Sequence, residues 1–141
     1  MSESTSDVHQ LARDFIEALS IPDRDRLREL IEPGARFWIN IGPVEITAED
    51  RFDVLAVERS FLATLAFDEV RIRPTTDGFV VQATTAATTT VGDPLSIPVC
   101  LVVTTDGSRI THVDEYADSA QAAPLLALVD PRRRARGAMA P

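Results

Sequence analysis

Apolar residues recur every three or four positions near the start of the chain, which is the spacing of an amphipathic helix. The positions that share this spacing are Val8, Leu11, Ala12, Phe15 and Leu19. They predict a first helix over residues 7–19, with one apolar face turned toward a core.

Two more helices are predicted from the residues at their ends. In SIPDRDRLRELIEPG (20–34), Ser20 is placed to cap a second helix, Pro22 suits its first turn, and Pro33-Gly34 ends it. Thr47, with Asp50 three residues later, resembles a capping box and predicts the start of a third helix. The apolar positions of this third helix are Val54, Val57, Phe61 and Leu65. Between the two helices, ARFWINI predicts a strand.

From residue 67 onward the chain is rich in β-forming residues. Four such runs are FDEVRIRPT (67–75), GFVVQATTAATTT (78–90), LSIPVCLVVTT (95–105) and RITHVDEYA (109–117), and turn signals separate them. SAQAAPLLALV (119–129) then predicts a short C-terminal helix. This order of elements predicts an α+β domain in which helices cover one face of a curved antiparallel sheet.

The strand segment SIPVCLVV is apolar at both parities. One parity holds Ile97, Val99, Leu101 and Val103, and the other holds Pro98, Cys100 and Val102. An antiparallel strand with one face in water normally alternates apolar and polar residues. We therefore expect both faces to be covered, one by helices and the other by a second subunit in a homodimer.

Composition and charge narrow the classes of protein. A chain of 141 residues with 45% hydrophobic residues is expected to be one globular domain, over 7–130, after a disordered segment 1–6. The net charge of −8 argues against a nucleic-acid partner, because binding phosphate requires a basic surface. Residues 131–141, which include Arg132 and Arg136, are expected to form a flexible tail.

The cellular compartment is inferred from what the chain lacks. Cys100 is the single cysteine, so no disulfide can form within the chain, which fits a reducing compartment. The first residues do not follow the pattern of a signal peptide, and no apolar run reaches the roughly 20 residues needed to cross a bilayer. We therefore expect a cytoplasmic protein with no membrane partner.

The order of elements, with GFVVQATTAATTT…LSIPVCLVVTTDGSRITHVDEYADSAQAAPL, resembles the nuclear transport factor 2-like superfamily. It is most similar to the SnoaL-like, ketosteroid-isomerase-like and limonene-epoxide-hydrolase-like branches, over about residues 7–129. The resemblance implies a cone-shaped, cystatin-like α+β barrel in which a curved antiparallel sheet wraps around N-terminal helices. It also implies a pocket between sheet and helices, and commonly a dimer.

The best-known activities of these branches are not supported residue by residue. Trp38 and Asn40 stand at the spacing of the Tyr-x-Asn of the epoxide-hydrolase branch, and Glu115 matches one of its catalytic acids. Thr84 and Ala86 occupy the positions of its basic–acidic pair, which is therefore missing. In the ketosteroid-isomerase branch the general base lies near Asn40, and an amide cannot abstract a proton.

Alternation along a strand divides RITHVDEYAD (109–118) into two sets of side chains. The resemblance places Glu115 on the pocket face, so the opposite set belongs to the outer face. The residues expected on the homodimer face are Val99, Leu101, His112, Asp114 and Tyr116. His112 and Asp114 supply at most half of a metal site, because the only other histidine, His9, is on the first helix. No metal and no cofactor are therefore expected.

Within the pocket, Glu115 is expected to act as a general acid or base whose pKa burial raises. Asn40 would orient a substrate oxygen, and Trp38 would form an apolar wall. The other expected substrate-binding positions are Phe15, Thr84, Ser96, Pro98, Cys100 and Val113. The alternative for Glu115 is a structural carboxylate hydrogen-bonded to Asn40, Thr84 or an arginine.

Two hypotheses of function follow. The first is a cofactor-independent isomerase, cyclase or dehydratase that acts on an apolar, oxygenated small molecule. The second is a ligand-binding or dimerisation module of the same fold without catalysis. An open cavity of a few hundred Å³ around Glu115 favours the first. A dry, closed cavity around Glu115, or a Glu115 salt-bridged to an arginine, would contradict the first hypothesis.

Overall fold

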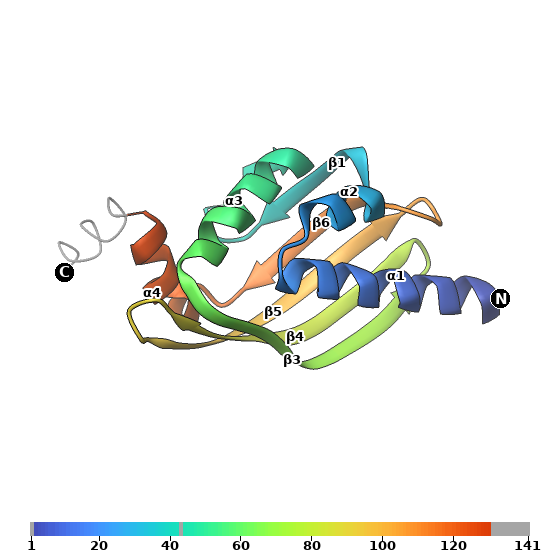
Figure 1. Cartoon of the computed structure of the whole chain (residues 1–141). Helices are drawn as coiled ribbons and strands as arrows, with labels where there is room; N and C mark the ends of the chain where they lie inside the picture. The colour runs from blue at the N-terminus through green and yellow to red at the C-terminus, as the bar shows by residue number, and fades with distance from the viewer. Residues whose placement is uncertain (1, 43, 131–141) are drawn as a thin grey trace.

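The computed structural model describes residues 2–42 and 44–130 of the chain. Its elements, in chain order, are α1 (Ser2–Ser20), α2 (Arg24–Leu30), β1 (Ile31–Ile39), β2 (Val44–Thr47), α3 (Ala48–Ser60), β3 (Leu62–Thr75), β4 (Gly78–Thr89), β5 (Pro94–Thr105), β6 (Ile110–Ala117) and α4 (Ser119–Val129). The strands form a six-stranded sheet in the order β2-β1-β6-β5-β4-β3. Figure 1 shows α1, α2 and α3 over one face of this sheet, with α4 at one end.

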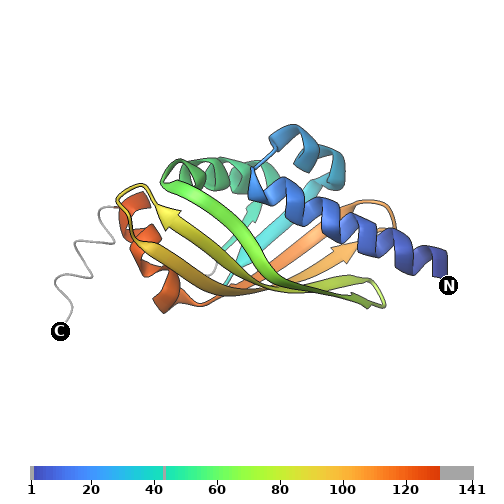
Figure 2. The same cartoon turned by 60° about the horizontal axis from the view of Figure 1, so that its bottom comes forward.

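The predicted α+β class and the curved sheet are confirmed. Strands β3 to β6 pair as successive antiparallel hairpins, as expected from their turn signals. The sheet is not wholly antiparallel, however, because β1 pairs in parallel with β6. Figure 2 shows the long strands curving beneath the helices without closing into a complete barrel.

The N-terminal helices differ from their predicted bounds. Helix α1 begins at Ser2, so residues 2–6, expected to be disordered, are helical. Ser20 does not cap α2, since its hydroxyl donates to the Glu17 carbonyl at 2.7 Å. Asp23 caps α2 instead, and its carboxylate accepts from the Arg26 N–H at 3.1 Å. Pro33-Gly34 does not end the helix either, because β1 begins at Ile31 and runs through both residues.

The predicted start of α3 is confirmed, and its predicted end is wrong. The Thr47 hydroxyl accepts from the Asp50 N–H at 3.1 Å and caps the helix. The helix ends at Ser60, and β3 begins at Leu62, so Leu65 belongs to a strand. The short strand β2 was not predicted. Helix α4 is confirmed, and the Asp118 carboxylate accepts from two N–H groups of its first turn.

Strand β3 contains a β-bulge that turns its side chains over. The register advances from Asp68 opposite Thr84 to Arg71 opposite Gln82, so β3 has one extra residue at this point. Glu69 within the bulge has a φ of 54°, the left-handed region that non-glycine residues seldom occupy. Consequently Phe67 before the bulge and Ile72 after it both pack toward the helices, although their numbers differ in parity.

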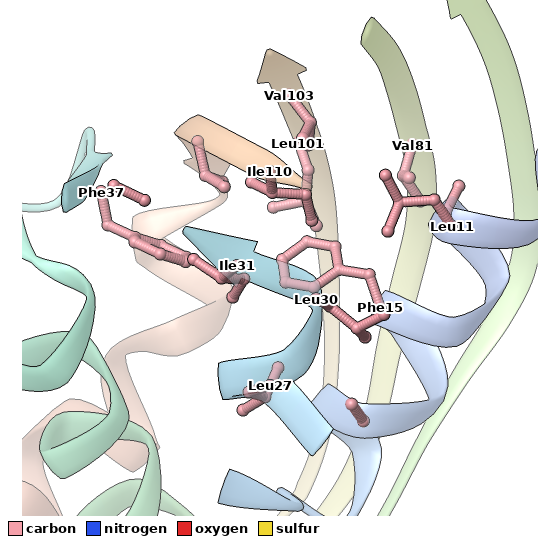
Figure 3. Close-up of a cluster of buried hydrophobic side chains, with 14 of the residues drawn as sticks. Leu11, Phe15, Leu27, Leu30, Ile31, Phe37, Val81, Leu101, Val103 and Ile110 are labelled. Carbon is pink, nitrogen blue, oxygen red and sulfur yellow. The ribbon is translucent and has the colours of Figure 1, made fainter. Parts of the chain in front are cut away.

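The apolar interior consists of two clusters. The larger lies between the sheet and α1, α2 and the start of α3, and Figure 3 shows Phe15 of α1 reaching toward Leu101 and Ile110. The smaller lies under α4. Its buried members are Leu62, Ala87, Leu95, Ile97, Ala122 and Leu125. The two clusters leave space between them, and the candidate site lies there.

Candidate functional site

A cavity of about 240 Å³ lies between the sheet and the helices. Helices α1, α3 and α4 contribute to it, and so do five of the six strands. Most of its walls are apolar. Among the residues that line it are Phe15, Leu19, Phe37, Ile39, Phe67, Val81, Val99, Leu101, Val113, Ala122 and Leu125. The volume agrees with the expectation of a pocket of a few hundred Å³ in this fold.

One wall of the cavity carries a cluster of three charged side chains. The guanidinium of Arg51 donates through Nη1 to Glu58 Oε1 at 3.1 Å and through Nη2 to Glu115 Oε1 at 3.2 Å. Arg51 is only 8% exposed, and all three residues line the cavity. One buried cation therefore holds two carboxylates at the edge of an apolar space.

The local structure explains why these three side chains meet. Arg51 and Glu58 are seven residues apart on α3, which is nearly two full turns, so they share the helix face that covers the sheet. Glu115 lies on β6 between Val113 and Ala117 in the inward-facing set of that strand. Helix and strand thus bring opposite charges together across the cavity.

The electrostatics of this cluster distinguish Glu58. Burial raises the pKa of its carboxyl above the ordinary value, and the nearby charge of Glu115 raises it further, while Arg51 acts in the opposite direction. Burial would lower the pKa of Arg51, but the two carboxylates outweigh that effect and raise it. The guanidinium therefore stays charged, and the Glu58 carboxyl retains its proton to higher pH than an ordinary glutamic acid.

Two other polar side chains reach the cavity. Arg59 is held by donating to the Leu62 carbonyl at 2.6 Å. The Thr85 side chain on β4 also lines the cavity, and its hydroxyl makes no hydrogen bond to any residue that the structure describes. Thr85 is therefore an available donor or acceptor on an otherwise apolar stretch of wall.

Three predicted site residues lie where the sequence placed them. Glu115, Phe15 and Val113 all line the cavity. Their positions agree with the expectation, whereas a role in binding or catalysis remains a prediction. The ion pair of Glu115 with Arg51, at 3.2 Å, is the arrangement expected to contradict the enzyme hypothesis in the form that makes Glu115 the acid or base.

Asn40 does not lie in the cavity wall. Its side-chain Nδ2 donates to the Ala117 carbonyl at 3.1 Å, and its Oδ1 accepts from the Ala117 N–H at 2.9 Å. The amide therefore continues the pairing of β1 and β6 beyond the last paired residues. This engagement corrects the expectation that Asn40 orients a substrate oxygen.

Four other predicted binding residues belong to the outer face of the sheet. Trp38 packs edge-on against Tyr116 at 5.2 Å between ring centroids. Thr84, Pro98 and Cys100 line a separate, shallow groove on that face. The parallel pairing is the reason: Ile39 lies opposite Glu115 and Trp38 opposite Asp114, so Trp38 and Glu115 point to opposite faces.

Ser96 was also expected to bind substrate in the pocket. It is exposed and lies on the same outer face of β5 as Pro98, so this expectation is wrong too. Val99 and Leu101, expected on the dimer face, instead line the cavity. His112, Asp114 and Tyr116 do lie on the face opposite Glu115. His112 Nε2 and Asp114 Oδ1 are 2.8 Å apart, so these two side chains pair with each other.

Sequence patterns did not identify Arg51, Glu58 or Thr85 as site residues. A usable signal existed for the first two, because a cation and an acid spaced by seven residues share one helix face. That face is only weakly apolar in α3, so the spacing alone did not identify it as the buried one. Thr85 was indistinguishable from its neighbours in a run of threonines and alanines.

Two features are absent from the described ranges, 2–42 and 44–130. No group of three or more His, Cys, Asp or Glu side chains is placed to hold a metal ion. No helix in this part of the chain is long and apolar enough to span a bilayer.

No protein-family model matches the sequence, and no curated protein matches it either. Solved structures do match the fold. One is IdmH from Streptomyces antibioticus, a proposed polyketide cyclase, at a TM-score of 0.73 and 18% identity over 84% of this chain and 97% of that one.

A second is a proposed SnoaL-like polyketide cyclase from Shewanella denitrificans OS-217, at a TM-score of 0.71 and 16% identity over 84% of this chain and 96% of that one. A third is an NTF2-like protein of unknown function from Burkholderia pseudomallei K96243, at a TM-score of 0.68 and 19% identity over 84% of this chain and 96% of that one. At these identities the likeness concerns the fold. The chain therefore has the nuclear transport factor 2-like fold.

Proposed function

We propose that this protein is a cofactor-independent acid/base enzyme that isomerises, cyclises or dehydrates a small, apolar, oxygenated compound. The observation that carries the proposal is the cluster of Arg51, Glu58 and Glu115 at the wall of an apolar cavity. Two carboxylates sharing one cation in a poorly solvated place do not both stay ionised easily. Such pairs supply the proton donor and acceptor of many acid/base enzymes.

Glu58 is assigned the proton transfer. Its raised pKa brings the carboxyl nearer to neutral pH, where a group is most effective as a general acid or base. In a ketone substrate, the Glu58 carboxylate would remove a proton from the carbon next to the carbonyl. The resulting carboxylic acid would return that proton to another carbon of the enolate or to its oxygen. Arg51 and Glu115 are positioning residues in this scheme.

This assignment changes which carboxylate is expected to react. Glu115 was expected to be the acid or base, and its pairing with Arg51 counts against that role. Glu58 also pairs with Arg51, but burial and the charge of Glu115 act on it in the same direction. The names of two structural neighbours, which are proposed polyketide cyclases, support chemistry of this general type in the fold.

A second candidate is a ligand-binding module of the same fold without catalysis. The observation in its favour is that each charged group of the cluster already has a partner within the cluster. Asn40, the expected orienting amide, is likewise engaged with backbone. In that case the cluster would only fix α3 onto β6.

We also propose that the protein works in the cytoplasm as a homodimer formed through the outer face of the sheet. The exposed side chains of Val102 and Tyr116 on that face support the homodimer. The single cysteine supports a reducing compartment such as the cytoplasm.

The two candidate functions are separated by hydrogen–deuterium exchange at the carbons next to the carbonyl of 2-tetralone, followed by NMR in D₂O. We expect the wild-type protein to accelerate exchange and Glu58→Gln to reduce that acceleration by about 10²–10⁴-fold, the usual contribution of general acid–base catalysis. Glu45→Gln is the matched control, because Glu45 is an exposed surface partner of Arg36.

Equal exchange by wild type and Glu58→Gln would refute the catalytic role of Glu58. Absence of acceleration by the wild type over the buffer would favour the binding module. Circular dichroism spectra of the variants establish that a lost rate is not a lost fold.

A further inference from the structure

The volume of the cavity restricts the size of its ligand. A dry cavity of about 150 Å³ accommodates benzene, and pockets for drug-sized ligands have about 300–1,000 Å³. The cavity here, at about 240 Å³, lies between these two cases. This volume therefore matches one ring or two fused rings better than three or four.

Apart from Arg59, which donates to the Leu62 carbonyl, the polar side chains of the cavity lie at two separate places on its wall. Thr85 on β4 is paired with Ile97 of β5, whereas Glu115 on β6 is paired with Leu101 of β5. They are thus two strands apart laterally and four residues apart along β5. With ordinary strand dimensions this diagonal is about 16 Å between Cα atoms on a flat sheet, and curvature shortens it somewhat. No single ligand oxygen can contact both side chains.

Between these two places the wall is apolar. Val99 lies on β5 between Ile97 and Leu101, so it occupies the middle of the diagonal, and all three line the cavity. An uncharged ring placed over Val99 would contact apolar atoms. Its ends would point toward the Arg51–Glu58–Glu115 cluster on one side and toward the hydroxyl of Thr85 on the other.

We propose that the cavity selects a compact compound of one or two rings that carries an oxygen function at each end, one facing the Arg51–Glu58–Glu115 cluster and the other hydrogen-bonded to Thr85. This inference rests on the proposed function for the orientation of the ligand.

Isothermal titration calorimetry with three probes tests the proposal. The probes are 6-hydroxy-2-tetralone, with two rings and an oxygen at each end, 2-tetralone, with one oxygen, and 2,6-dihydroxyanthraquinone, with three linear rings. We expect 6-hydroxy-2-tetralone to bind about fivefold more tightly than 2-tetralone, the typical effect of one neutral hydrogen bond. The three-ring probe is expected not to bind.

Two variants assign the binding to this cavity. Thr85→Val should weaken 6-hydroxy-2-tetralone about fivefold and leave 2-tetralone unchanged, since it removes the hydroxyl and keeps the shape. Val99→Phe should abolish binding of both by filling the middle of the cavity. Val102→Phe is its control, because Val102 lies on the same strand but on the outer face, with 38% of its surface exposed.

The proposal is overturned if the three-ring probe binds as tightly as the two-ring probe, or if no two-ring probe binds up to its solubility limit. It is also overturned if Thr85→Val weakens both tetralones equally, or if Val102→Phe acts like Val99→Phe in a protein that remains folded. Failure of the proposed function has a different signature. In that case the tetralones bind as expected, and neither the wild type nor Glu58→Gln accelerates their deuterium exchange.

Discussion

The two faces of strand β5 have nearly the same chemical character and quite different surroundings. On the inner face, Leu101 is 4% exposed, and on the outer face, Val102 is 38% exposed, although the two residues are adjacent. The inner face meets helices and a cavity, whereas the outer face meets a shallow groove. The apolar residues of β5 therefore suit burial on both faces, but only the face that the helices cover is buried within one chain.

Hydrogen-bonded polar pairs on the two faces show the same contrast. On the inner side, Arg51 is almost completely buried, and burial also raises the pKa of its partner Glu58. On the outer side, His112 and Asp114 form a pair of similar length that stays about one-third exposed. Water screens exposed pairs and makes them worth little, whereas buried pairs are costly to disturb. We therefore expect the Arg51–Glu58 pair, and not the His112–Asp114 pair, to take part in function at neutral pH.

The largest expected effect comes from truncating the two adjacent side chains. Leu101→Ala should lower the free energy of unfolding by about 2–5 kcal/mol, since it removes buried methyl groups and leaves a cavity. Val102→Ala should lower it by less than about 1 kcal/mol in the monomer, because the side chain is already in contact with water. Urea unfolding followed by circular dichroism measures both.

Similar losses from the two variants at low protein concentration would contradict the contrast between the faces. A loss in Val102→Ala that grows with protein concentration would instead indicate that the outer face is covered by association.

The next prediction concerns the outer face directly. If a second copy covers it, Val102→Arg places a charge in the interface and should convert a dimer into a monomer, because an unpaired buried charge is strongly unfavourable. Light scattering coupled to size-exclusion chromatography gives the mass. Val91→Arg is the matched control, since Val91 is exposed in the loop between β4 and β5.

A wild-type protein that is monomeric at high concentration would refute the homodimer. A dimer that both substitutions leave intact would place the interface on another surface.

The smallest expected effect is the pH dependence of stability that Glu58 contributes. Its pKa is raised in the folded protein, so over the pH range between the unfolded and folded values the folded state binds more protons. The corresponding stabilisation is complete below the unfolded pKa and is lost as pH rises through the folded pKa. Glu58→Gln should remove this decline, and urea unfolding at a series of pH values measures it.

An exposed ion pair between α2 and α3 provides the opposite sign for comparison. Hydrogen bonds from Arg28 lower the pKa of Glu49 to about 2, so the stabilisation from Glu49 is lost as pH falls toward that value. Because this contribution is common to wild type and Glu58→Gln, it cancels in their difference. A difference that does not change with pH would show that burial does not perturb Glu58.

Much of the fold was predictable because it depends on local signals. The Thr47 cap, the turns between the long strands and the apolar period of α1 each name an element without reference to the rest of the chain. The end of α3 was not predictable in this way, since Phe61 and Leu65 continue a helical spacing that tertiary pairing with β4 overrides.

The site was harder to predict because it depends on which face each strand turns inward. Alternation correctly separated Glu115 from His112, Asp114 and Tyr116. It could not orient β5, which is apolar at both parities, and the parallel register of β1 against β6 was needed to orient Trp38. Arg51 and Glu58 required knowledge of which face of α3 meets the sheet.

The bulge at Glu69 makes the wall of the cavity sensitive to the length of the chain. Side chains change face across it, so Phe67 and Ile72 both point inward only because one extra residue stands between the paired segments. A single deletion there would restore simple alternation and turn one half of β3 outward. In evolution, therefore, a single insertion or deletion at this point can change which side chains of β3 line the cavity. No substitution of those residues is needed.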